Sequence, residues 1–164
     1  LEKIGKPDVL VGQFEIPMNV NEQVFSYAYK NGVETVLNPA PANKPSDILL
    51  QNTSWFIPNE IEFEEIYGDI FNENNLLLFA KNVDTNVVVT LGEKGCAYIE
   101  NNSVKIIKAD SVKAIDTTGA GDAFVGAFSF ALASKLDIEE CLKLALKKAT
   151  DSVTKKGTQS SYKN

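Results

Sequence analysis

Short apolar runs alternate with segments of helical periodicity along most of the chain, and this alternation restricts the fold more than any other feature. Strand-like runs lie at residues 9–11, 35–37, 55–57 and 86–91, and helical spacing at residues 20–31, 60–67, 72–81, 123–133 and 138–153. Two more runs, 96–99 and 104–108, flank Asn101-Asn102 and predict a β-hairpin. Because strands that alternate with helices are typical of βαβ units, we predict an α/β fold with a mostly parallel sheet flanked by helices.

The composition excludes several classes of function. The 164 residues are 44% hydrophobic, and no linker or repeat divides them, so we expect residues 1–164 to form a single α/β domain. With 22 acidic and 16 basic residues the net charge is -6, which disfavours binding to nucleic acid. No apolar run approaches the roughly 20 residues of a membrane span, so we expect no membrane association.

The two cysteines and the lack of histidine narrow the chemistry further. Cys96 and Cys141 are far apart and form no C-x-x-C pair, so we expect reduced thiols in a cytoplasmic protein. Without His the usual zinc ligand sets are excluded, and acid–base catalysis would fall to carboxylates or lysines.

A glycine-rich turn at residues 116–124, with the sequence Asp-Thr-Thr-Gly-Ala-Gly-Asp-Ala-Phe, begins a long apolar helical segment. Unpaired N–H groups and the helix dipole suit this turn to an anion, and Gly119 and Gly121 let the backbone approach it. Asp122 could then accept the proton of a hydroxyl that attacks a bound phosphate. A tight loop with Asp122 as an ordinary first-turn acid is an equally good interpretation of the turn alone.

Other polar residues follow the ends of the predicted strands, where open α/β sheets bind ligands. Asn59 and Glu62 share one face near a helix start and could organise the water shell of a phosphate-bound Mg²⁺, or simply cap the helix. The segment after the strand at 86–91 could lie against a nucleotide or form a plain turn. Its residues are Thr90, Leu91, Gly92, Glu93, Lys94 and Gly95. Glu15 follows the first strand, and its residue type alone favours a solvated position in a loop.

Taken in order, these motifs resemble those of the ribokinase-like carbohydrate kinases, and within that family they are most similar to the ribokinases. The resemblance covers essentially the whole chain. It rests on the turn at 116–124 and on Gln13-Phe14-Glu15, Asn38-Pro39-Ala40-Pro41, Pro58-Asn59-Glu60-Ile61-Glu62, Thr90-Leu91-Gly92-Glu93-Lys94-Gly95 and Thr154-Lys155-Lys156-Gly157-Thr158-Gln159-Ser160-Ser161. It implies a ribokinase-like fold with Rossmann-like layering.

The resemblance also implies a reaction, the phosphorylation of the primary hydroxyl of D-ribose, or of a similar sugar, by ATP. Asp122 matches the catalytic base, and the N–H groups of Gly119, Ala120 and Gly121 match the anion hole for the transferred phosphoryl group. Asn59 and Glu62 match the motif that positions phosphate and Mg²⁺. Residues 90–95 match the nucleotide loop, and Glu15 matches a carboxylate on the sugar side.

A second ion is implied beside the anion hole, a monovalent cation that is usually K⁺ and is bound mainly by carbonyls. The matching positions are Asp116, Thr118, Ser152, Lys155, Gly157 and Ser161. Such a cation would fix two loops and add positive potential near the phosphate.

The chain departs from the family in that it matches only the C-terminal, ATP-binding half. The N-terminal half, with sugar-binding glycines, further strands and a β lid through which family dimers pair, has no counterpart in it. We therefore expect little or no turnover from the isolated chain, and a homodimer remains open for the parent protein. Two alternatives also stay open: a related kinase for another sugar or a nucleoside, and a noncatalytic nucleotide-binding module.

Overall fold

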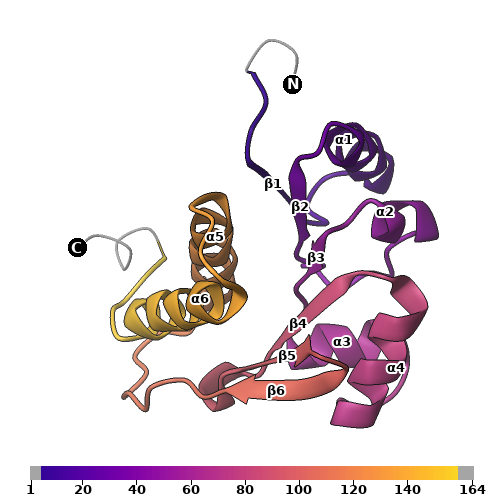
Figure 1. Ribbon diagram of the computed structural model, residues 1–164. Coiled ribbons are helices and arrows are strands. Elements are labelled where there is room, and N and C mark those ends of the chain that lie inside the picture. Colours follow the sequence, from indigo (N-terminus) through magenta and orange to yellow (C-terminus); the bar gives the residue numbers. More distant parts are fainter. Residues whose placement is uncertain (1–4, 159–164) are drawn as a thin grey trace. The chain divides into compact units, whose positions relative to one another are not determined.

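The computed structural model describes residues 5–158, and its chain folds into two compact units (Figure 1). The first unit comprises the residues up to Val89 together with Ala97–Lys105. The second unit comprises Thr90–Cys96 and the residues from Ile106 onward. The chain crosses between the units within a strand, so secondary structure continues from one unit to the next.

Six strands form one sheet in the order of the chain. They are β1 (Val9–Gly12), β2 (Glu34–Leu37), β3 (Trp55–Phe56), β4 (Asn86–Thr90), β5 (Cys96–Glu100) and β6 (Ser103–Ile107). The first four pair in parallel, as the alternation of strands and helices predicted. Parallel pairing brings the carboxyl ends of β1 to β4 to the same edge of the sheet, where the predicted polar residues follow them.

The predicted hairpin joins β5 to β6 through a two-residue turn at Asn101 and Asn102. Both residues lie in the left-handed region, with φ of 50° and 59°. Asn tolerates this region better than most residues, and two positive φ values suit the twist of a tight hairpin. The expectation from the Asn-Asn pair is therefore confirmed.

Four helices belong to the first unit, and Figure 1 shows them beside the parallel strands. They are α1 (Met18–Lys30), α2 (Asp47–Gln51), α3 (Glu60–Tyr67) and α4 (Glu73–Val83). The helix α2 has no counterpart in the sequence prediction, because five residues are too few to show a helical period. Its start is marked by an N-cap, because the Ser46 hydroxyl accepts a hydrogen bond from the N–H of Leu49 at 3.2 Å.

The core of the first unit lies between one face of the sheet and these helices. The strand register places Gly12, Leu37 and Phe56 in one row across that face. A Cβ on Gly12 would lie 2.5 Å from the Phe25 ring of α1, so only glycine lets α1 pack this closely. Further along the row, the rings of Phe56 and of Phe79 in α4 have centroids 5.6 Å apart.

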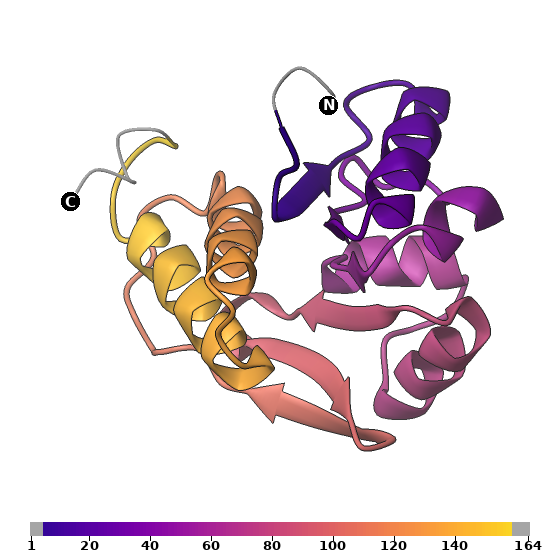
Figure 2. The same cartoon turned by 45° about the horizontal axis from the view of Figure 1, so that its top comes forward.

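The second unit contains α5 (Ala120–Ala133) and α6 (Ile138–Val153), which pack against each other as a helical hairpin (Figure 2). The prediction for α6 is confirmed at both ends, whereas α5 begins at Ala120 and not at residue 123. Gly119 has a φ of 80° and ends the preceding loop, and the Ala123 N–H already donates to its carbonyl at 2.9 Å. The glycine-rich turn is therefore the first turn of the helix itself.

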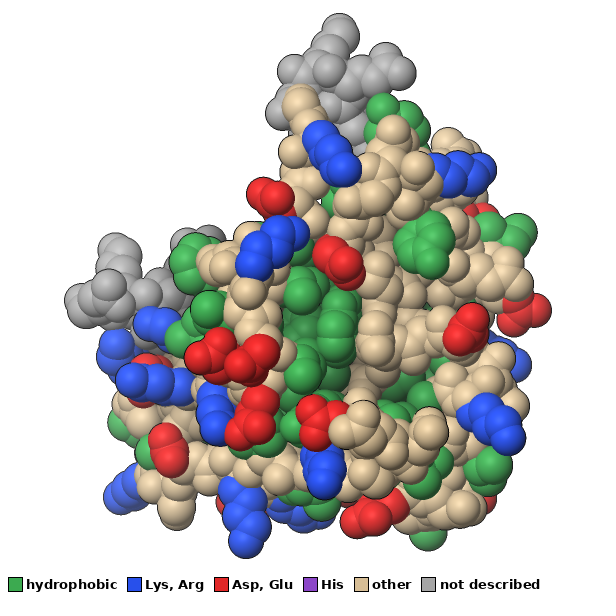
Figure 3. Space-filling model, viewed as in Figure 1, with side chains coloured by type: hydrophobic (Ala, Val, Ile, Leu, Met, Phe, Trp, Pro, Cys, Tyr) green, Lys and Arg blue, Asp and Glu red, His purple; other side chains and the backbone are tan. Residues whose placement is uncertain are grey.

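The surface agrees with the charge balance of the chain. On the face shown in Figure 3, basic side chains are scattered among acidic ones, and no continuous basic patch forms. Within residues 5–158, no helix is long and apolar enough to cross a membrane.

Candidate active site

The predicted functional residues fall into both units. Glu15, Asn59 and Glu62 belong to the first unit. The second unit holds the segment Thr90, Leu91, Gly92, Glu93, Lys94 and Gly95, together with Asp116, Thr118, Gly119, Ala120, Gly121, Asp122, Ser152, Lys155 and Gly157. Ser161 lies outside the described residues.

One backbone N–H group at the start of α5 has no hydrogen-bond acceptor among the described residues. The Ala120 N–H donates to the Thr117 carbonyl at 3.3 Å, whereas the Gly121 N–H has no acceptor among the described residues. A Cβ placed on Gly121 would have no neighbouring heavy atom of the chain within 4 Å. Since a helix N-terminus attracts negative charge, this turn is a physically suitable anion site, centred on Gly121 more than on Ala120.

Asp122 is the next residue along this turn and is exposed. Its carboxylate and the Gly121 N–H group therefore lie in the same helical turn. A phosphate at the N–H group and a proton acceptor beside it are the two groups that a phosphoryl transfer to a hydroxyl requires.

Two loops of the second unit are joined by the Asp116 carboxylate. Its Oδ1 accepts a hydrogen bond from the Thr118 N–H, and its Oδ2 accepts one from the Gly157 N–H, both at 3.0 Å. The Asp116 N–H donates in turn to the Val153 carbonyl at 3.2 Å. These bonds, first that from Thr118 and then that from Gly157, lower the pKa of Asp116.

The two loops predicted to hold a monovalent cation are thus brought together. Each carboxylate oxygen of Asp116 accepts one N–H group and has lone-pair capacity left for a further ligand. The Ser152 hydroxyl donates to the Ala149 carbonyl of its own helix at 2.7 Å, and the Lys155 N–H donates to the Ser152 carbonyl at 3.3 Å.

The predicted nucleotide loop is a tight turn around a short 3-10 helix, η1 (Gly92–Lys94). The Leu91 N–H donates to the Gly95 carbonyl at 2.8 Å and closes the turn. Gly95 has a φ of 107°, and a Cβ there would lie 1.9 Å from the Ile107 carbonyl oxygen. Local geometry alone therefore requires the glycine at 95, with or without a nucleotide.

Asn59 and Glu62 form a capping box at the start of α3. The Asn59 Oδ1 accepts a hydrogen bond from the Glu62 N–H, and the Glu62 Oε2 accepts one from the Asn59 N–H, both at 2.8 Å. The Asn59 Nδ2 and the Glu62 Oε1 have no partner among the described residues. Each side chain therefore caps the helix and still has one polar atom to offer to a ligand.

Glu62 is buried, with 8% of its surface exposed. Burial raises its pKa above the ordinary value of 4.5, the nearby Glu65 charge adds to this effect, and the hydrogen bond from Asn59 opposes it. A glutamine could accept the same N–H bond without the cost of burying a charge. The position of Glu62 in the first turn of α3 partly offsets this cost, because a helix N-terminus favours negative charge.

Two residues with a structural part in this region were given no role from the sequence. The Gln13 Nε2 donates to the Asn38 Oδ1 at 2.9 Å, and the Asn38 Nδ2 donates to the Ile57 carbonyl at 2.9 Å. The available signal was their position, because each follows the end of a predicted strand. Glu15 lies two residues after Gln13 and is exposed.

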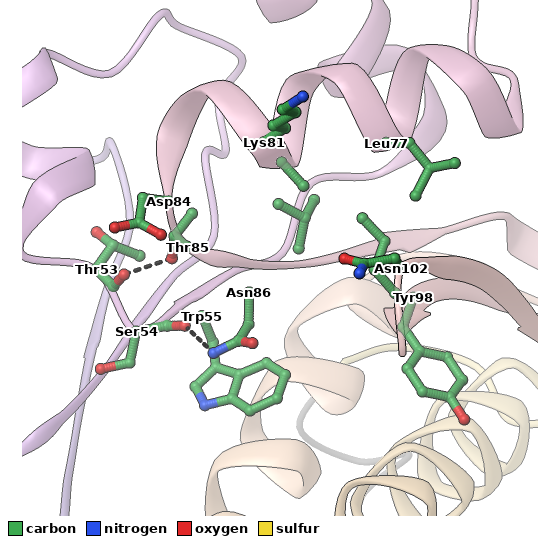
Figure 4. A pocket seen from close by; sticks show the side chains of 13 residues that line it. Thr53, Ser54, Trp55, Leu77, Lys81, Asp84, Thr85, Asn86, Tyr98 and Asn102 are labelled. Atoms are coloured by element: carbon green, nitrogen blue, oxygen red, sulfur yellow. Dashed lines mark hydrogen bonds between the residues drawn. The ribbon is translucent and has the colours of Figure 1, made fainter.

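The first unit also contains an open pocket of about 780 Å³ at the opposite ends of β3 and β4, where these strands begin. Figure 4 shows Lys81 and Leu77 of α4 on one side, and Trp55 and Asn86 on the other. None of the predicted functional residues lines it. Its polar groups do not converge on one point, as they do in small-molecule sites.

The described residues contain no group of three or more His, Cys, Asp or Glu side chains that could hold a metal ion. Any Mg²⁺ at the capping box would therefore keep much of its water shell and depend on phosphate oxygens, which is the usual behaviour of this ion.

Comparisons with known proteins give similarities that cover nearly the whole chain. The model of the pfkB family of carbohydrate kinases matches residues 8–164. A ribokinase of Haemophilus influenzae is 41% identical and covers 97% of this chain, and a deoxyribokinase of Salmonella typhi is 36% identical and covers 98%. The solved structure of an Arabidopsis thaliana ribokinase, complexed with ribose and ATP, has a TM-score of 0.87 at 28% identity over 94% of this chain.

The matched part is only about half of each relative. It amounts to 54% of the Haemophilus influenzae ribokinase, 55% of the Salmonella typhi deoxyribokinase and 52% of the Arabidopsis thaliana ribokinase. Within that part, the fold of the chain is that of the ribokinases, with a mostly parallel sheet and flanking helices.

Gly121 and Gly126 offer a matched pair of substitutions in α5, since a Cβ on either would meet no atom within 4 Å. We expect Gly121→Ala and Gly126→Ala each to leave thermal stability unchanged or raise it by up to about 1 kcal/mol. Only Gly121→Ala should weaken ATP binding in a calorimetric titration, by about tenfold or more, because its methyl group would enter the space proposed for phosphate. Equal ATP affinities of the two variants would contradict the placement of the anion site.

Glu62→Gln tests the cost of the buried carboxylate. The pKa of Glu62 is raised in the folded state, so folding favours the neutral carboxyl group. This contribution to the stability of the fold is fully present below pH 4.5 and is lost as the pH rises through the folded pKa. We therefore expect Glu62→Gln to gain stability relative to the wild type between pH 4 and pH 8 in chemical denaturation. Glu73→Gln, an exposed first-turn position of α4, should show no such gain, and an advantage of Glu62→Gln that is independent of pH would refute the argument.

Proposed function

The chain belongs to the pfkB family of carbohydrate kinases, and from this premise we propose that it carries the ATP-binding and catalytic part of a kinase for the primary hydroxyl of D-ribose. The observation that supports this most is the start of α5. There the Gly121 N–H has no acceptor among the described residues, a Cβ on Gly121 would meet no atom within 4 Å, and Asp122 lies in the same turn.

In the proposed reaction, Asp122 accepts the proton of the sugar hydroxyl while the hydroxyl oxygen bonds to the γ-phosphorus of ATP. The bond from that phosphorus to the bridging oxygen breaks, and ADP leaves. A carboxylate suffices as base because the hydroxyl becomes acidic only as its oxygen bonds to phosphorus. The Gly121 N–H, with the adjoining N–H groups of Gly119 and Ala120, stabilises the negative charge of the transferred phosphoryl group.

Mg²⁺ and K⁺ fit the residues that the chain offers. The Glu62 Oε1 and the Asn59 Nδ2 are available to a hydrated Mg²⁺ and to a phosphate oxygen respectively. A bound Mg²⁺ would neutralise phosphate charge during transfer. K⁺ would bind to carbonyls of the loops that Asp116 joins, and its charge would add to the potential at the anion hole.

The relatives support a sugar substrate. The Haemophilus influenzae relative is a ribokinase, and the Arabidopsis thaliana ribokinase was solved with ribose and ATP. Glu15 is exposed in the loop after β1, and we assign it to the sugar side. The deoxyribokinase of Salmonella typhi makes deoxyribose the second candidate substrate.

We also propose that residues 1–164 form a single α/β domain that is the ATP-binding half of a longer kinase. The coverage of about half of each relative supports this division. Cys96 and Cys141 are both free thiols, and on this ground we place the protein in the reducing cytoplasm. Burial raises the pKa of Cys96 to about 12, which makes this thiol unreactive.

A chimera tests the proposal, with this chain replacing the matching 54% of the Haemophilus influenzae ribokinase. We expect ADP release that depends on D-ribose, and a loss of roughly 10²- to 10⁴-fold in kcat on Asp122→Asn, since proton transfer contributes about that much. The exposed Asp110→Asn serves as the matched control and should keep full activity.

The same assay with deoxyribose, fructose and adenosine decides the substrate. A clear preference for one of these over D-ribose would overturn the assignment of the sugar. ATP binding without ADP release on any substrate, or full activity in Asp122→Asn, would overturn the catalytic role.

A further inference from the structure

Asn38 connects three consecutive strand ends of the first unit through one side chain. It follows β2 and is 8% exposed. Its Oδ1 accepts a hydrogen bond from the Gln13 Nε2, and its Nδ2 donates to the Ile57 carbonyl, both at 2.9 Å. Its own N–H donates to the Gly12 carbonyl at 3.0 Å, so the segments after β1 and after β3 are both held to the end of β2.

The hydrogen bond from the Asn38 side chain to the Ile57 carbonyl lies where the pairing of β2 with β3 ends. The Ile57 N–H still pairs with the Leu37 carbonyl at 2.8 Å, as in the sheet, but the Ile57 carbonyl pairs with the Asn38 side chain. The hydrogen-bond ladder between β2 and β3 thus ends at the side-chain amide of Asn38. Pro58 follows and cannot donate a hydrogen bond, and its ring fixes its own φ. Asn59 is the next residue and begins the capping box.

Only one proline therefore separates the carbonyl held by Asn38 from the residue that begins the capping box. With the Ile57 carbonyl fixed and the Pro58 φ restricted, the Asn59 backbone has little freedom to turn relative to the sheet. The orientation of Asn59 then sets that of Glu62, because each accepts the N–H of the other.

We propose that Asn38 is a positioning residue, which aims the phosphate and Mg²⁺ groups of Asn59 and Glu62 by holding the Ile57 carbonyl. The functional part of this inference rests on the proposed function. The positional part concerns the free chain and needs no ligand. Asn38 touches no substrate in this account and acts only through Ile57.

Asn38→Asp separates the two arms of the side chain. The aspartate keeps an oxygen for the Gln13 donor, but it replaces the Nδ2 donor by an oxygen that repels the Ile57 carbonyl. We expect the amide hydrogens of Asn59 and Glu62 to exchange at least about tenfold faster in the ligand-free variant, measured by NMR.

Thr53→Val is the control for a general loss of stability. Thr53 lies just before β3, is 3% exposed, and its hydroxyl donates to the Leu49 carbonyl at 2.8 Å. This variant also removes one buried hydrogen bond next to β3, but at the other end of the strand. It should leave the exchange of Asn59 and Glu62 unchanged.

Gln13→Met provides a second variant in case Asn38→Asp fails to fold. It removes the donor that orients Asn38 without changing Asn38 itself, and it should accelerate the same two amides to a smaller degree. Unchanged exchange in whichever variant folds, or equal acceleration in Thr53→Val, would overturn the positioning role.

A second readout concerns the function. In the wild type, Mg²⁺ should increase the affinity for ATP, and Asn38→Asp should lose most of this increase while Thr53→Val keeps it. A wild type without any increase would contradict the proposed Mg²⁺ site, whereas the exchange of ligand-free Asn59 and Glu62 would still decide the role of Asn38. An increase that Asn38→Asp retains in full would contradict the role of Asn38 alone.

Discussion

The parallel pairing of β1 to β4 is the constraint on which the site in the first unit depends. Because these strands run in one direction, the segments that follow them leave the sheet at one edge. Gln13, Asn38 and Asn59 all lie just beyond a strand end. The Gln13 side chain donates to that of Asn38, which in turn donates to the Ile57 carbonyl, two residues before Asn59. A slip of one residue in the strand register would place every side chain of that strand on the other face of the sheet and would disrupt these hydrogen bonds.

The start of α5 differs from most other helix starts because no side chain forms a capping hydrogen bond there. Side chains of Ser46, Asn59, Asn72 and Asp137 cap α2, α3, α4 and α6. Gly119 at the start of α5 has no side chain to serve as a cap, and α1 begins after a proline without one. At α5 the result is that the Gly121 N–H has no acceptor among the described residues. The Asp116 carboxylate holds the neighbouring loop through the N–H groups of Thr118 and Gly157.

Much of this could be predicted from the sequence, because periodicity and turn residues are local signals. The parallel strands, the Asn101-Asn102 hairpin and α6 required nothing else. The helix α2 was missed because five residues carry no period, and the start of α5 was placed three residues late because glycines usually argue against a helix. The bonds of Asn38 to Gln13 and Ile57 span 25 and 19 residues, and such contacts leave no trace in local pattern. The capping box of Asn59 and Glu62 and the ligand role proposed for them use the same spacing, so the two cannot be told apart in the sequence.

Backbone NMR can test whether the first turn of α5 binds the phosphates of ATP, as proposed. The chain labelled with ¹⁵N would be titrated with ATP in the presence of Mg²⁺ and K⁺, and the amide resonances of α5 followed. We expect the largest shift at the Gly121 amide, smaller shifts at Gly119 and Ala120, and none at Gly126, about one and a half turns further along the same helix. Saturable binding of ATP without a shift of the Gly121 amide resonance would show that the phosphates do not bind at this turn.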